Sequence, residues 1–144
     1  MYNKLLLLGM FILTANHAIL GQSEKWNSLI KNEYLIEYPN NWDLDESGQM
    51  GTSFFLFSAL QSQEDQFREN VNLLIQDLSG HQLDLDEYVE LSEDQIKKMI
   101  TDSEIIESKR VVNSESTYHK VLYTGKQGTY HLKFVQYYWL VADK

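Results

Sequence analysis

Hydrophobic and polar positions alternate in several short runs along the first half of the chain, which predicts strands. The run Glu33–Tyr38 ends before Pro39, the only proline, which has no N–H to donate to a strand ladder. Residues 51–58 are rich in aromatics without clean alternation and predict a strand buried on both faces. Residues 71–78 predict a third strand, and the polar residues 43–48 predict a loop.

One segment has the period of an amphipathic helix. Asp84 precedes it, and Glu87 stands three residues later, which is a capping-box variant. The helix should end at residues 101–103. Its apolar stripe predicts packing against a sheet, with a groove for a partner as the less favoured alternative. The stripe consists of Leu85, Tyr88, Val89, Ile96, Met99 and Ile100.

Strand patterns return after the helix. Residues 105–112 predict a fourth strand, and the runs 117–124 and 129–141 predict a long hairpin whose turn is Gly125–Gly128. The segment 22–33 fits either a helical turn or a first strand, and its pattern leaves both open.

A turn centred on Lys126 and Gln127 places His119 and His131 on opposite faces of the hairpin. A zinc site needs converging ligands at a recognisable spacing, and none is present. The sequence also has no Gly-x-Ser-x-Gly elbow, no phosphate-binding loop and no EF-hand order in its acidic loop. We therefore predict no catalytic residue, no metal and no cofactor.

The N-terminus has the parts of a secretory signal peptide: Lys4, the apolar run Leu5–Leu13, and small and polar residues up to Gly21. The apolar run is too short for a stable membrane span. We predict a signal peptide over 1–21 and a single domain over 22–144, in a protein that is exported to the periplasm or secreted. The alternative is an uncleaved anchor.

Composition narrows the range of functions. The chain of 144 residues has a formal net charge of −9, and cleavage would remove one lysine and no acid. Such a surface repels phosphate backbones, so we expect no nucleic-acid partner, and it disfavours adsorption to anionic lipid. Because the apolar run is short, we also expect no stable membrane span after signal cleavage. The chain has no cysteine, which excludes disulfides, thiolate sites and a lipid-modified cysteine.

Aromatic residues are the best candidates for binding, because Tyr and Trp at a wet sheet edge are frequent contact residues. We identify Trp42, Tyr130 and Tyr137 as candidate surface aromatics for protein binding. Trp42 has two interpretations, a stacking platform for a ligand or an indole that covers the core, and the second is favoured.

The order of these parts resembles the PsbP-like superfamily over residues 26–144. The resemblance rests on the start Tyr38–Trp42, the run Asn70-Val71-Asn72, the helix with Leu85 and Tyr88, and a long hairpin with Gln136 in its second strand. It implies an α+β fold with a central antiparallel sheet flanked by helices. It also implies a binding or assembly role without catalysis. The family usually continues with a further strand and a C-terminal helix, so the resemblance implies a chain that lacks both.

These observations predict an exported, non-catalytic binding or assembly protein with a protein partner in the cell envelope. The alternative is a small envelope hydrolase that uses acidic residues which the sequence does not identify.

Overall fold

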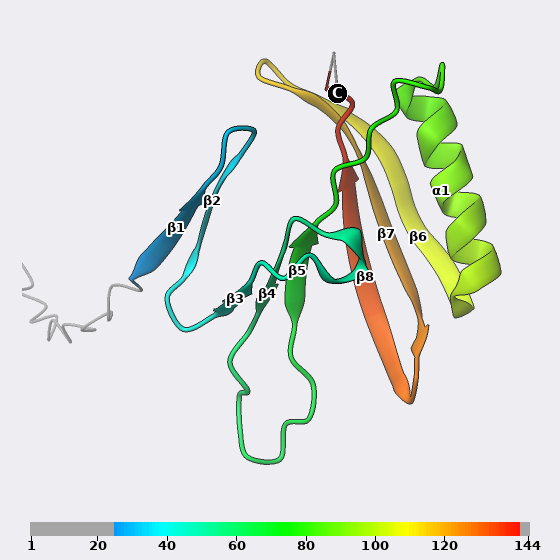
Figure 1. The fold of residues 1–144 in the computed structure, drawn as a ribbon. Coiled ribbons are helices and arrows are strands. Elements are labelled where there is room, and N and C mark those ends of the chain that lie inside the picture. Colours follow the sequence, from blue (N-terminus) through cyan, green and yellow to red (C-terminus); the bar gives the residue numbers. More distant parts are fainter. Residues whose placement is uncertain (1–24, 142–144) are drawn as a thin grey trace, which may run out of the picture. The chain divides into compact units, whose positions relative to one another are not determined.

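A computed structural model describes residues 25–141, so the predicted signal peptide (1–21) lies outside the described residues. The described chain forms three small antiparallel sheets and one α-helix, and the predicted α+β class is confirmed (Figure 1). In place of one central sheet flanked by helices, the strands are divided among these sheets. Hydrophobic alternation identifies strands but not their partners.

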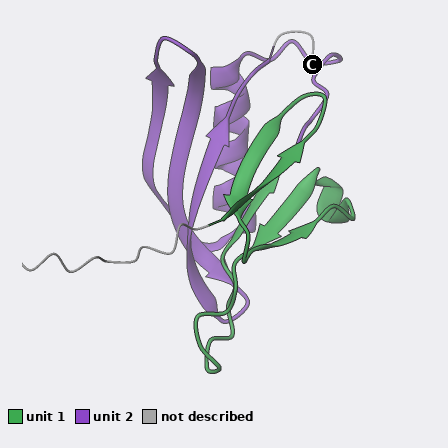
Figure 2. Cartoon of the chain, turned by 90° about the vertical axis from the view of Figure 1, so that its left-hand side faces the viewer, with its two compact units in different colours: residues 1–74 green, residues 75–144 purple. Residues whose placement is uncertain are grey.

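The chain divides into two compact units at Leu74/Ile75 (Figure 2). The first unit contains two sheets. One pairs β1 (Trp26–Ile30) with β2 (Leu35–Pro39), so the segment before Glu33 forms a strand and not a helical turn. The other has the order β3-β4-β5. Its strands, with the single-turn helix between the first two, are β3 (Asp43–Asp45), η1 (Gln49–Gly51), β4 (Phe54–Phe57) and β5 (Asn70–Leu73).

Three expectations for the first unit are corrected. The predicted loop 43–48 contains β3, which pairs with β4. Strand β4 buries only one face: its first and third residues are buried, whereas Phe55 and Phe57 are half-buried and stack with ring centroids 5.5 Å apart. Strand β5 ends at Leu73, well before the predicted residue 78.

The core of the first unit lies between side chains of both its sheets. The buried residues are Leu29, Tyr38, Phe54 and Leu56. The ring of Tyr34 lies 5.7 Å from that of Phe54, centroid to centroid. Aromatic and aliphatic burial on this scale is the main source of stability for a small β unit.

The second unit consists of α1 (Leu85–Met99) and a sheet of order β6-β7-β8. The helix begins as predicted: Asp84 accepts a hydrogen bond from the backbone N–H of Glu87, and the Glu87 carboxylate accepts one from the N–H of Asp84. The strands are β6 (Thr101–Val112), β7 (Thr117–Gln127) and β8 (Tyr130–Tyr138).

Helix α1 covers one face of this sheet, which we call the inner face (Figure 1). Leu85, Val89 and Ile96 of the helix form a buried cluster with Val121 and Tyr123 of β7. The predicted apolar stripe therefore packs on a sheet except at Met99, which is 78% exposed at the end of the helix. Because side chains alternate along a strand, the even-numbered residues of β7 point to the opposite face, which we call the outer face.

The centre of the hairpin turn lies two residues later than predicted. Gln127 pairs with Tyr130, so Gly128 and Thr129 form a two-residue turn. Gly128 has φ +60°, the left-handed value that such a turn requires at its first position. The predicted turn glycine Gly125 lies inside β7 instead.

Strand β6 follows the helix almost directly. It begins at Thr101, although residues 101–103 were predicted as a break. The start of β6 is irregular: its pairing with β7 shifts register between Thr101 and Glu104, and Asp102 has φ +52°. The polar residues thus mark a bulge inside a strand and not its absence.

Candidate protein-binding surface

Three aromatic side chains gather on the outer face of the second sheet. The ring centroids of Tyr118 and Tyr137 are 5.8 Å apart, and that of Trp139 lies 5.4 Å from Tyr118 and 5.9 Å from Tyr137. Tyr118 comes from the start of β7 and the other two from the end of β8 and just beyond it. We call this group the outer aromatic cluster. Its mutual contacts hold large apolar surfaces at a fixed place on a sheet.

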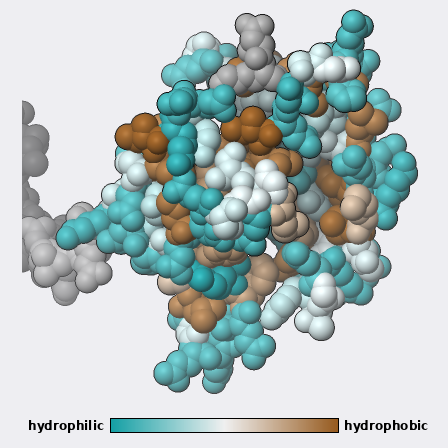
Figure 3. All heavy atoms as spheres, viewed as in Figure 1, coloured by the Kyte–Doolittle hydropathy of each residue, from teal (hydrophilic) through white to brown (hydrophobic). Residues whose placement is uncertain are grey.

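The outer aromatic cluster is open to solvent. Tyr137 is 49% exposed and Trp139 is 52% exposed, and Val135, on the same face of β8, is 46% exposed. Figure 3 shows one face of the molecule, on which brown hydrophobic residues lie among teal hydrophilic ones. Exposed clusters of large apolar side chains are typical of interaction sites, whereas single exposed residues are ordinary.

A pair of lysines borders the cluster on the same face. Lys109 of β6 and Lys120 of β7 lie directly opposite each other, and Lys120 in turn lies opposite Tyr137. Like charges at directly opposite positions destabilise a sheet. One carboxylate offsets this repulsion: Glu107 lies 3.2 Å from the Lys109 Nζ and 2.8 Å from the Lys120 Nζ.

Glu107 and Lys120 hold each other in their charged forms. Hydrogen bonds from Lys120 and then Lys109 lower the pKa of Glu107 below its usual value. The hydrogen bond with Glu107 raises the pKa of Lys120. Two positive charges therefore share one negative charge at neutral pH, which leaves a positive excess next to the aromatic rings.

The other two predicted surface aromatics lie elsewhere. Trp42 is half-buried and packs against the core of the first unit, which agrees with the favoured interpretation as a core cover. Tyr130 is 39% exposed at the far end of β8. Its even number in β8 places it on the inner-face side, whereas Tyr137 is on the outer face. The structure does not bring the three predicted residues together.

A serine–histidine contact lies on the inner face. Ser108 Oγ is 2.8 Å from His119 Nε2, the distance of a nucleophile and its base. The other ring nitrogen of His119 is buried and has no hydrogen-bond partner in the part of the chain that the structure describes. The third group that orients the base in a triad is therefore missing from this pair.

The remaining chemistry is sparse. His119 and His131 point to opposite faces, as predicted, because their partners across the hairpin are Tyr138 and Lys126. Among residues 25–141, no group of three or more His, Asp or Glu side chains is placed to hold a metal ion. No helix within that range has the length and apolar character needed to cross a bilayer.

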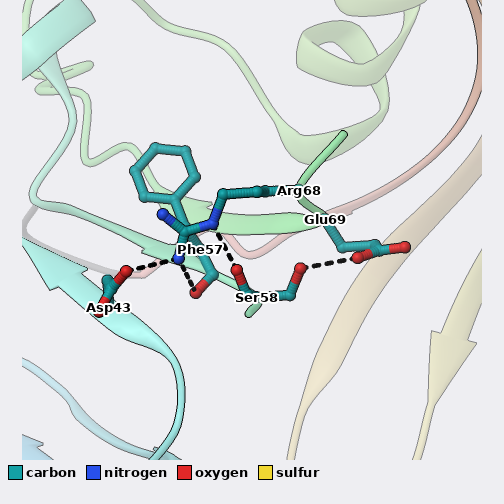
Figure 4. A network of polar contacts seen from close by, with 5 residues as sticks. All are labelled: Asp43, Phe57, Ser58, Arg68 and Glu69. Atoms are coloured by element: carbon teal, nitrogen blue, oxygen red, sulfur yellow. Dashed lines mark hydrogen bonds and ion pairs between the residues drawn. The ribbon is translucent and has the colours of Figure 1, made fainter. Parts of the chain in front are cut away.

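A polar network in the first unit is structural (Figure 4). Arg68 donates to the backbone carbonyls of Ser58, at 2.5 Å, and Phe57, at 3.1 Å, and forms a 2.6 Å ion pair with Asp43. Its guanidinium also lies 5.5 Å from the centroid of the Phe57 ring. The buried Ser58 hydroxyl donates to Glu69 at 2.7 Å. The network ties the ends of β3 and β4 to the segment before β5.

Sequence reasoning identified Tyr137 but missed its neighbours Tyr118, Trp139 and Lys120. The signal that finds them is the hairpin register, since only the correct pairing places Lys120 opposite Tyr137. Arg68 was also missed, and its polar surroundings in sequence contain no signal for the network.

Comparison of the chain with known protein families, with characterised proteins and with solved structures found no match. The geometry of the second sheet therefore carries the functional interpretation.

Burial of Tyr138 on the inner face gives the second unit a testable pH dependence. Burial raises the pKa of the Tyr138 hydroxyl from 10.0 to about 12. Stabilisation by the neutral hydroxyl is complete below pH 10 and is lost as the pH rises towards 12, because the unfolded chain releases this proton first. We expect the urea midpoint to fall across this range and Tyr138→Phe to reduce the fall.

The exposed Tyr137 provides the matched control for this experiment. Tyr137→Phe makes the same chemical change on the outer face and keeps Tyr138, so it should retain the full fall. Equal slopes for Tyr138→Phe and the unsubstituted chain would contradict the assignment to Tyr138.

Proposed function

We propose that the chain is an exported, non-catalytic binding or assembly protein of the PsbP-like type, whose partner is a protein of the cell envelope. The observation that carries the proposal is the outer aromatic cluster. Tyr137 and Trp139 are each about half exposed although they stack on each other. Exposed Tyr and Trp side chains on a rigid sheet are the residues that most often dominate protein interfaces.

The PsbP-like part of the proposal rests on the sequence resemblance. Its support in the structure is limited to one helix on one face of an antiparallel sheet, with the Leu85 and Tyr88 positions in that helix. The resemblance implies a single central sheet flanked by helices, and an experimental structure of the chain with its partner would test this arrangement.

A capture experiment tests the binding role. The chain is immobilised and exposed to envelope extract, in parallel with a Tyr137→Ser/Trp139→Ser variant. We expect a stoichiometric protein partner on the unsubstituted chain and its loss on the variant. A Trp26→Ser variant is the control, because Trp26 is 56% exposed in the first unit. Equal capture by all three proteins would refute a role for the outer aromatic cluster.

A small envelope hydrolase is the second candidate, and the Ser108–His119 contact is the observation that favours it. Turnover on ester, glycoside and peptide substrates should be absent if the protein only binds. Turnover that is lost in Ser108→Ala, or in a single Asp or Glu substitution, would establish an enzyme and end the first proposal.

A further inference from the structure

The lysine pair, Lys109 and Lys120, and the outer aromatic cluster together indicate which kind of ligand this face could bind. The pair consists of two cations with a single carboxylate between them, Glu107. In every other cross-strand pair of this sheet that contains a lysine, the opposite residue is a threonine, a tyrosine or a histidine. The Lys109–Lys120 row is thus the one place in the sheet where lysines face each other, and it borders Tyr137.

The excess positive charge is unusual for this protein, whose formal net charge is −9. The acids of the second unit are concentrated in α1, which carries Asp86, Glu87, Glu90, Glu93 and Asp94. On the outer face, by contrast, Lys109 and Lys120 share one carboxylate next to the aromatic rings, and Glu104 and the Asp102–Lys126 ion pair lie towards the other end of the strands. Charge complementarity therefore favours an acidic partner at this face and not a basic one.

We propose that the outer face of the second sheet binds an acidic polypeptide segment. A carboxylate of the segment joins Glu107 between Lys109 and Lys120, and an adjacent apolar side chain packs on the rings of Tyr137 and Trp139. This inference rests on the proposed binding function and specifies the chemistry of the partner.

The lysine side chains are placed for this role. Lys120 is the more buried of the two, with a side chain 25% exposed, and that of Lys109 is 52% exposed. A partly desolvated ammonium binds a carboxylate more strongly than one in open water, because the local dielectric constant is lower. Tyr137 lies directly opposite Lys120 and places an aromatic ring beside the pair.

The experiment uses the full chain and a short labelled peptide in which Glu and Phe alternate, with binding followed by fluorescence anisotropy. Lys120→Gln should weaken binding by on the order of tenfold, and Tyr137→Ser should have a similar effect. Glu107→Gln should strengthen binding by on the order of tenfold, because it frees both lysines for the ligand. If Glu107, Lys109 and Lys120 had a purely structural role, Glu107→Gln would not strengthen binding.

Controls separate the two parts of the ligand. Peptides that alternate Lys with Phe, or Glu with Ser, should bind more weakly than the Glu/Phe peptide. Lys97→Gln removes the same charge from α1, where the side chain is 57% exposed, and should leave binding unchanged. If Lys120→Gln fails to fold, Lys109→Gln replaces it, since its side chain is more exposed.

Three results would overturn the inference. One is equal loss of affinity in Lys97→Gln and Lys120→Gln. Another is binding of a polyuronate but not of the peptide. The third is protection of Trp139 from acrylamide in the free chain, without peptide, measured as the emission lost in Trp139→Phe, because Trp139 is 52% exposed in the structure. If the peptide fails to bind while envelope capture still depends on Tyr137 and Trp139, the acidic partner is refuted and the proposed function stands.

Discussion

Leu56→Ala is expected to lower the free energy of unfolding by about 2–5 kcal/mol, because it removes a fully buried side chain and leaves a cavity. Leu56 is 2% exposed in the middle of β4, opposite Leu44 of β3 and Val71 of β5. It belongs to the core that both sheets of the first unit share. Urea unfolding followed by circular dichroism should show a lower midpoint.

Leu60→Ala is the matched control for this substitution. Leu60 is 52% exposed in the same unit, so the same chemical change should alter the free energy of unfolding by no more than about 0.5 kcal/mol. If the two variants unfolded at the same urea concentration, the assignment of Leu56 to the core of the first unit would be wrong.

The helix was the most predictable element, and the reason is local. The capping box needs only Asp84 and Glu87, which lie in one turn, and the apolar stripe needs only the helical period. Both signals are complete within a short stretch of sequence. The structure confirms the start of the helix and its end before Thr101, and only the beginning of β6 differs from the prediction.

Strand pairing was less predictable, because a strand finds its partner far away in sequence. The pattern indicated strands near β2, β4, β5, β6, β7 and β8, but it could not show that they divide into separate sheets. It also missed β3, whose three residues lie among acids. A strand this short is formed by its pairing with β4 and not by its own composition.

An error in the predicted register of the hairpin changes which residues lie next to Tyr137 in the candidate site. The predicted hairpin pairs Tyr137 with Ser116, in a segment expected to be a break, whereas Tyr137 actually lies opposite Lys120. The error of four residues is even, so each residue kept its face and the two histidines still diverge. The faces could thus be predicted from the sequence, but the neighbours of Tyr137 could not.

The displaced turn has a physical cause that leads to a further expected result. The sequence predicts Gly125 in the hairpin turn, because glycine is common in turns. In the structure it is buried inside β7, opposite Leu132, and an added Cβ would lie only 2.2 Å from Cγ2 of Ile100. Glycine is required here by the close approach of Ile100, the residue that links α1 to β6.

Gly125→Ala should therefore destabilise the chain by about 1–3 kcal/mol, the usual cost of overpacking a core. Gly80→Ala is the control, since nothing lies within 4 Å of an added Cβ there, and it should be neutral or slightly stabilising. Thermal and urea unfolding of both variants measure the difference.

A second substitution tests whether the clash with Ile100 is the cause. Ile100→Leu keeps the side-chain volume and removes the Cγ2 branch that the new Cβ would meet. In the Gly125→Ala/Ile100→Leu double variant, we expect the cost of Gly125→Ala to fall by more than half, which a double-mutant cycle would report as coupling between the two positions. Additive effects would instead assign the cost to the Thr101 carbonyl, which lies 3.4 Å from the added Cβ, and would show that Ile100 does not restrict this point of β7.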